Sequence, residues 1–242
     1  MAFPVDPTQL ALATAVMALG ATVQGSVGFG LNLLAAPLLL LIDHRMVPGS
    51  VLIAAMSLVA MMTYRERSAV DFRGLGWAVA GRVLGTVAGA MTLASLSQRG
   101  ISVGVGCVVV GAVVMSASGI HFGPTPRILV GAGLLAGFMG TTASTGGPPM
   151  ALVYQHSAGA TVRATLAGHF LIGAPMSLAG VAVAGRLGAT EVMLGLALIP
   201  GVVIGFLASY FVAPILDRGF TRAAVLTVSA AAGLLVLVRE LL

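Results

Sequence analysis

Long apolar segments separated by short polar breaks make up the chain of 242 residues. Seven breaks leave eight segments, with approximate bounds 8–42, 46–64, 74–96, 100–120, 127–155, 164–184, 190–214 and 220–238. A helix needs about 20 apolar residues to cross a hydrocarbon core of roughly 30 Å. Because the segments are continuously apolar rather than alternating, they predict about eight transmembrane helices and not the strands of a barrel.

Two of these segments are longer than one crossing requires, and each is interrupted by glycine. Gly-rich runs lie at 20–30 and 137–147, and proline follows each run. Glycine and proline within a span free backbone groups that lipid cannot satisfy. Such interruptions are tolerated where the backbone is buried in protein or lines a cavity. We therefore expect broken helices in segments one and five.

The two halves of the chain repeat each other. The Gly-rich runs are 117 residues apart, and the glycines at 81 and 85 recur 120 residues later. These offsets predict two repeats of four helices, residues 1–122 and 123–242, within one membrane domain. Small residues four apart let helices approach closely in lipid. The glycine rows therefore predict tight packing, either within one chain or at the seam of a homodimer.

The composition supports a membrane location. Apolar residues make up 58% of the chain and charged residues only 8%, and the mean hydropathy is +1.07. Soluble domains have about a quarter of their residues charged. The N-terminus lacks the basic region of a secretory signal, so the first segment is predicted to be a span of the mature protein. We expect an all-α, multi-pass protein of the cytoplasmic membrane.

The charge and cysteine content exclude several kinds of partner. The net charge is +5, but the twelve arginines are scattered and form no patch for phosphates, which argues against nucleic acid. The single cysteine, Cys107, excludes an intramolecular disulfide and a thiolate metal cluster. The histidines lack metal-ligand spacing. The sequence predicts no metal and no cofactor, and the expected partners are the bilayer and a small anion.

An anion is favoured because no carboxylate lies at the centre of a predicted span, where proton-relay carboxylates usually lie. Arg82 lies about nine residues into the third segment. It would either snorkel to the interface or be paired structurally, or else line the path and bind an oxyanion through its planar fork. His169, about six residues into segment six, has two interpretations. It is a hydrogen-bond partner between helices, or it has a substrate or proton role.

The two interruptions carry the remaining candidate residues. In transporters, paired broken helices mark a substrate site near the membrane midplane, and the N-terminal ends of half-helices suit anions. The hydroxyl and amide side chains would bind oxyanion oxygens or satisfy backbone groups freed by the break. The predicted substrate-binding residues are Gln24, Ser26, Gly28, Gly30, Asn32, Arg82, Thr141, Ser144, Thr145, Gly146, Gly147, Pro148 and His169.

Two stretches also carry a resemblance to a known family. VQGSVGFGLNLLAAPLLLL at 23–41 and GFMGTTASTGGPPMALVYQ at 137–155 resemble the paired signature of the TauE/SafE membrane transporters. The resemblance implies a duplicated four-helix plan and export or exchange of small sulfur-containing anions, such as sulfite and organosulfonates. The first stretch departs from a common, more Gly-rich version at Phe29 and Asn32, which leaves the substrate open.

The sequence therefore predicts a transporter of a small sulfur oxyanion that works by alternating access, with its site between the two interruptions. A channel-like passive conductor and a structural membrane subunit remain as alternatives. An intramembrane hydrolase with Ser144 as nucleophile and His169 as base is the third. Duplication favours a transporter, because a two-sided pathway uses both copies whereas an active site needs one. We therefore expect no enzyme.

Overall fold

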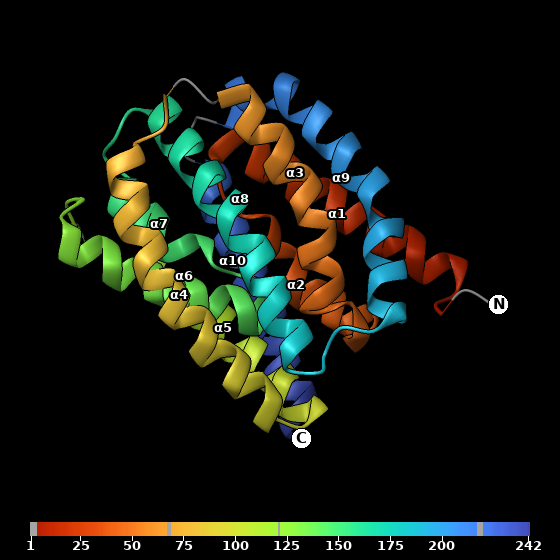
Figure 1. Ribbon diagram of the computed structural model, residues 1–242. Coiled ribbons are helices and arrows are strands. Elements are labelled where there is room, and N and C mark those ends of the chain that lie inside the picture. Colours follow the sequence, from red (N-terminus) through yellow and green to blue (C-terminus); the bar gives the residue numbers. More distant parts are fainter. Residues whose placement is uncertain (1–3, 67–68, 121, 217–219) are drawn as a thin grey trace.

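The computed structural model describes residues 4–66, 69–120, 122–216 and 220–242, and within these ranges every regular element is a helix (Figure 1). The elements are α1 (Pro7–Val27), α2 (Leu31–Ile42), the short 3-10 helix η1 (His44–Met46), α3 (Gly49–Glu66), α4 (Phe72–Ser95), α5 (Gln98–Ala117), α6 (Pro126–Ala143), α7 (Gly147–Tyr154), α8 (Gly159–Val183), α9 (Ala189–Leu216) and α10 (Phe220–Leu241).

Six of the described helices are long and apolar enough to cross a membrane, namely α1, α4, α5, α8, α9 and α10. This confirms the prediction of an all-α, multi-pass membrane protein. Helices α3 and α6, with 18 residues each, and the shorter α2 and α7 fall outside that set. Helix α3 packs against α8 and α9, and α6 packs against α4.

The polar breaks begin and end these helices through local capping. Asp6 and Gln9 form a capping box at the start of α1, where the Asp6 side chain accepts a hydrogen bond from Gln9 N at 2.9 Å. The Asp71 carboxylate accepts from Gly74 N at 3.0 Å at the start of α4. Ser97 caps α5 in the same way. Capping satisfies N–H groups that a helix leaves unpaired at its start.

The first over-long segment contains α1 and α2, and α2 folds back along the end of α1. Gly28 and Gly30 have φ of 104° and 126°, a conformation that favours glycine and allows the chain to reverse. A β-carbon on Gly20 would lie 3.2 Å from the Cα of Leu31. Arg45, just after α2, donates to the Pro4 carbonyl oxygen at 2.8 Å, so α2 returns to the end where α1 starts. The sequence predicts a single crossing here, and the two glycines explain the difference.

The second over-long segment contains α6 and α7 and reverses in a similar way. Ser144 has φ of 57°, and Thr145 N donates to the Met139 carbonyl oxygen at 3.1 Å. A β-carbon on Gly146 would lie 2.5 Å from the Ala136 carbonyl oxygen, so α7 begins against the last turns of α6. Gln155, just after α7, donates to the Ile120 carbonyl oxygen at 3.0 Å, a few residues before α6 starts.

The glycine rows bring helix backbones into contact within the chain. In α4, a β-carbon on Gly81 or Gly85 would lie closer than 3.0 Å to a carbonyl oxygen of α6. In α9, a β-carbon on Gly201 or Gly205 would lie equally close to a carbonyl oxygen of α1. The predicted tight packing is thus confirmed at these positions, and it lies inside one chain. A homodimer stays a prediction.

The start of α1 and the end of α10 lie at one end of the bundle, called here the N/C end, because both contact the end of α2. Arg239 donates to the Leu41 carbonyl oxygen at 3.2 Å, and Arg99 donates to the Glu240 carbonyl oxygen. The opposite end, called here the far end, contains the ends of α3, α5 and α7 and the starts of α4, α6 and α8. These two ends orient the site described below.

Candidate functional site

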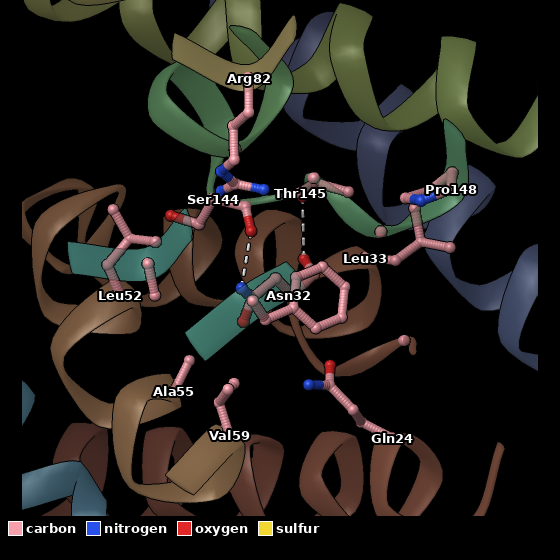
Figure 2. Close-up of a pocket in the computed structure, with 16 residues that line it drawn as sticks. Gln24, Asn32, Leu33, Leu52, Ala55, Val59, Arg82, Ser144, Thr145 and Pro148 are labelled. Atoms are coloured by element: carbon pink, nitrogen blue, oxygen red, sulfur yellow. Dashed lines mark hydrogen bonds between the residues drawn. The ribbon is translucent and has the colours of Figure 1, made fainter. Parts of the chain in front are cut away.

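A cavity lies where the two interruptions meet, near the starts of α2 and α7 (Figure 2). Its volume is about 40 Å³, which is enough for roughly three water molecules. Nine of the thirteen predicted residues line it. The lining consists of Gln24, Gly30, Asn32, Leu33, Leu52, Ala55, Val59, Arg82, Gly140, Ser144, Thr145, Gly146, Gly147, Pro148, Phe170 and Ala174.

Helix α2 offers backbone N–H groups at the cavity. The N–H groups of a first helical turn have no partner inside the helix. Leu31 N donates to the Gln24 side-chain oxygen at 3.1 Å, so that one is satisfied. Asn32 and Leu33, which line the cavity, bring the next N–H groups of the turn. The start of α2 also carries the positive end of the helix dipole, so it suits an anion.

Helix α7 offers fewer backbone N–H donors than α2. Its first turn contains Gly147, Pro148 and Pro149, and proline has no N–H. Gly147 is therefore the donor of that turn. The prediction that both interruptions supply N–H groups thus applies more to α2 than to α7.

Asn32 joins the two interruptions. Its Nδ2 donates to the Ser144 carbonyl oxygen at 2.6 Å, and its backbone oxygen accepts from the Thr145 hydroxyl at 3.3 Å (Figure 2). The Asn32 Oδ1 atom is buried without a hydrogen-bond partner. Burying a polar atom without a partner is costly, so Asn32 Oδ1 is available for a ligand that donates or for a water.

Arg82 reaches the cavity from α4 with its guanidinium inside the bundle (Figure 2). The residue is only 2% exposed, so the snorkelling interpretation is wrong. Nη1 donates to His169 Nε2 at 2.7 Å and Nη2 donates to the Ser177 hydroxyl at 3.2 Å, while Nε has no partner. A β-carbon on Gly173 would lie closer than 3.0 Å to the guanidinium carbon, so this glycine makes room for the charge.

The charge of Arg82 has no carboxylate partner among the described residues. The ion pairs of the described part of the chain involve Arg45, Arg65 and Arg163, which lie near the two ends of the bundle. The effective penalty for a buried ion is on the order of several kcal/mol unless an opposite charge compensates it. Arg82 therefore leaves the cavity with an uncompensated positive charge.

Four predicted residues lie outside the cavity lining. The Ser26 hydroxyl donates to the Thr22 carbonyl oxygen, one turn earlier in α1, at 2.8 Å. Gly28 lies against Arg163. Thr141 and His169 lie behind Arg82: His169 contacts it directly, and the Thr141 hydroxyl bonds to Ser177 at 3.1 Å.

Apart from His169, sequence reasoning missed the contribution of α8. Gly173 and Ser177 both contact Arg82, and Phe170 and Ala174 line the cavity. His169, Gly173 and Ser177 are four residues apart, so they lie on one face of the helix. This spacing in the sequence indicates one helix face with two polar side chains and a glycine between them, where a polar side chain of another helix can pack.

The arrangement does not pair a nucleophile with a base. The Ser144 hydroxyl donates to the Pro48 carbonyl oxygen at 2.9 Å, and His169 Nε2 accepts from Arg82. Both groups are therefore engaged elsewhere, and the hydrolase alternative lacks the hydrogen bond that activates a serine.

A second cavity, of about 210 Å³, lies beside the first toward the far end. The two cavities share Pro148 in their linings. A β-carbon on Gly147 would lie 3.2 Å from Phe29 and 3.3 Å from Phe170. Arg163 lines the second cavity, and its Nε bonds to Glu66 at 3.0 Å. Gly147, which lines the central cavity, is thus close to Phe29, which lines the outer one.

The comparison with protein families gives one match. The family model described as sulfite exporter TauE/SafE matches residues 12–236, nearly the whole chain. Neither the curated proteins nor the solved structures contain a match to this chain.

Proposed function

The chain belongs to the sulfite exporter TauE/SafE family of membrane transporters, which are not enzymes, and from this membership we propose that it carries a small sulfur-containing oxyanion. The substrate is sulfite or an organosulfonate, and the membrane is the cytoplasmic membrane. The central cavity between the two interruptions is the binding site, and the residues that line it bind the anion.

The observation that carries this proposal is the buried guanidinium of Arg82. It faces the cavity, is 2% exposed, and is hydrogen-bonded to an imidazole and a hydroxyl rather than to a carboxylate. A bound oxyanion supplies the missing negative charge and accepts from the free Nε–H. The N–H groups at the start of α2 donate from another side of the cavity.

The cavity volume favours a compact anion. A space for roughly three water molecules matches sulfite, which has four heavy atoms. An organosulfonate with a carbon chain requires the cavity to widen, and the adjoining outer cavity offers that space.

Alternating access is supported by the relation between the two halves, 1–122 and 123–242. Helix α1 packs on α9 as α6 packs on α4, and α2 packs on α10 as α7 packs on α5. Helices α1, α2, α4 and α5 thus correspond to α6, α7, α9 and α10, each five α-helices later, with partners exchanged. Rocking one repeat against the other would open the central cavity to each side in turn.

The contact around Gly147 favours a transporter over a channel-like conductor. Phe170, which lines the central cavity, and Phe29, which lines the outer one, both lie against Gly147. A passive conductor requires a continuous path, whereas a transporter requires a barrier that opens on one side at a time.

The proposal is tested with the variant Arg82→Gln, which removes the charge and keeps hydrogen-bonding capacity. Sulfite should raise the melting temperature of the purified wild type, because a ligand that binds only the folded state stabilises it. We expect this shift, and sulfite flux in proteoliposomes, to be lost in Arg82→Gln.

The matched control is Arg127→Gln, which removes an exposed charge at the start of α6. It should keep both the shift and the flux. Sulfite flux that survives Arg82→Gln unchanged would contradict the proposed site. The absence of any response of the wild type to sulfite and sulfonates would contradict the substrate.

A further inference from the structure

We infer that the Arg82–His169 pair couples binding of the anion to uptake of a proton by His169, so that anion and proton are carried together. This inference rests on the proposed function and adds a coupling ion to it. The observations that support it are a hydrogen bond, a buried unpartnered atom and the charges around the ring.

The hydrogen bond fixes the protonation state of His169 in the empty cavity. A guanidinium can only donate, so the 2.7 Å contact with Arg82 Nη1 makes His169 Nε2 the acceptor. The ring is therefore neutral and holds its proton on Nδ1. That Nδ1 is buried without a partner, and the residue is 0% exposed. A second proton has to bind at Nε2, where Arg82 now occupies the lone pair.

The charges that face His169 come from the helices packed on α8. From α4, Arg82 contacts the ring directly, and Arg73 is exposed in the first turn. Asp71 lies at the start of α4, where its N–H bonds to Thr165, one turn before His169. From α7, the Tyr154 hydroxyl bonds to Asp71 at 2.8 Å. From α3, Arg65 and Glu66 lie at the far end, with Glu66 paired to Arg163. From α6, the one charged residue is Arg127, at its first turn.

Arg82 is thus the group that controls protonation of the ring. While its positive charge lies against Nε2, a second positive charge on His169 is opposed by repulsion and by the blocked lone pair. An oxyanion in the cavity neutralises the guanidinium and competes for its donors. Nη1 is then drawn toward the anion, Nε2 is freed, and one proton binds there from the side that is open.

Linkage makes the coupling reciprocal. If the bound anion favours protonation of His169, then protonation of His169 favours the anion by the same factor. Anion affinity should therefore rise as the pH falls, by up to about tenfold per pH unit for one linked proton. The bound state contains Arg82, the anion and a protonated His169, and one proton crosses the membrane with each anion.

The experiment is calorimetric titration of the purified protein in buffers of different ionisation enthalpy, which measures the protons taken up per bound anion. Methanesulfonate is the first probe, because its charge is constant between pH 5.5 and 8. Sulfite is the second, and the proton count with methanesulfonate, which does not titrate, decides the test. The wild type should take up a substantial fraction of a proton per anion, and His169→Gln should take up none while still binding.

Ser177→Ala is the matched control, because it removes the other hydrogen bond to Arg82 but adds or removes no titratable group. It should weaken binding and leave proton uptake in place. Binding by the wild type without proton uptake would overturn the inference even if His169→Gln does not fold. Proton uptake that persists in a folded His169→Gln would overturn it as well. Absence of anion binding by the wild type would instead overturn the proposed function.

Discussion

At the scale of single residues, the position of the Arg82 guanidinium depends on Gly173, which has no side chain to occupy the same space. Gly173 leaves a gap in the face of α8, and the guanidinium fills it. His169 and Ser177 lie one turn on either side and accept its hydrogen bonds. The charge is thereby held at the cavity rather than at the membrane interface.

The variant Gly173→Ala should displace the guanidinium. The added β-carbon would lie closer than 3.0 Å to its central carbon, and the hydrogen bonds to α8 would be lost with the shift. Alanine favours the helix by up to about 1 kcal/mol, so stability of α8 itself should not suffer. We expect sulfite affinity, measured by calorimetry, to fall at least about tenfold, as loss of one good hydrogen bond predicts.

Gly76→Ala is the control for this change. Gly76 lies on α4, like Arg82, and a β-carbon there would meet nothing within 4 Å. The sulfite affinity of Gly76→Ala should equal that of the wild type. Equal affinities for Gly173→Ala and the wild type would show that the guanidinium does not bind the anion from its present position.

The sequence predicted which polar residues belong together but not their hydrogen bonds. Gln24 and Asn32 were predicted as substrate-binding residues, and both line the central cavity. Whether Arg82 snorkels or is buried depends on which way its helix face points, which a single sequence leaves open. The partners of Arg82 lie about 90 residues away in the chain, so only the packing of α4 against α8 brings them together.

At the scale of elements, the glycine rows set how closely two helix pairs pack. Gly85 on α4 and Gly205 on α9 each lie against a carbonyl oxygen of the neighbouring helix. A methyl group cannot fit without separating the backbones. We expect Gly85→Ala and Gly205→Ala each to lower the free energy of unfolding by about 1–3 kcal/mol, measured by thermal denaturation in detergent.

Gly111→Ala on α5 provides the contrast, because a β-carbon there would meet nothing within 4 Å. It should be neutral or slightly stabilising through helix propensity. Similar melting temperatures for all three variants would mean that α4 and α6, and α9 and α1, are packed less closely than the backbone contacts indicate.

The reversals of the chain are the elements that the sequence described least well. Gly-rich runs with a following proline predict an interruption, and the helices do stop there. The same composition allows a kink within one crossing or a full turn back. The outcome depends on contacts outside the run, such as that of Arg45 with Pro4 or of Gln155 with Ile120. The number of crossings could therefore not be read from segment lengths alone.

At the scale of the whole molecule, the reversals change how the two halves relate. Because α2 returns to the N/C end, the first half contains five α-helices that run alternately between the ends, and it finishes near the far end. The second half starts there and finishes at the N/C end. Two halves with an odd number of traverses have opposite orientations, which is the arrangement that gives transporters two equivalent states facing opposite sides.

The opposite orientation of the two halves predicts from which side of the membrane an introduced cysteine can be labelled. In a Cys107→Ser background, which removes the exposed native thiol, cysteines would replace exposed Thr8, Thr125 and Leu242. In sealed vesicles, a maleimide that cannot cross the membrane should label the Thr8 and Leu242 positions from one side and the Thr125 position only from the other. Labelling of all three from the same side would mean an even number of crossings in each half, and the two halves would then be parallel rather than inverted.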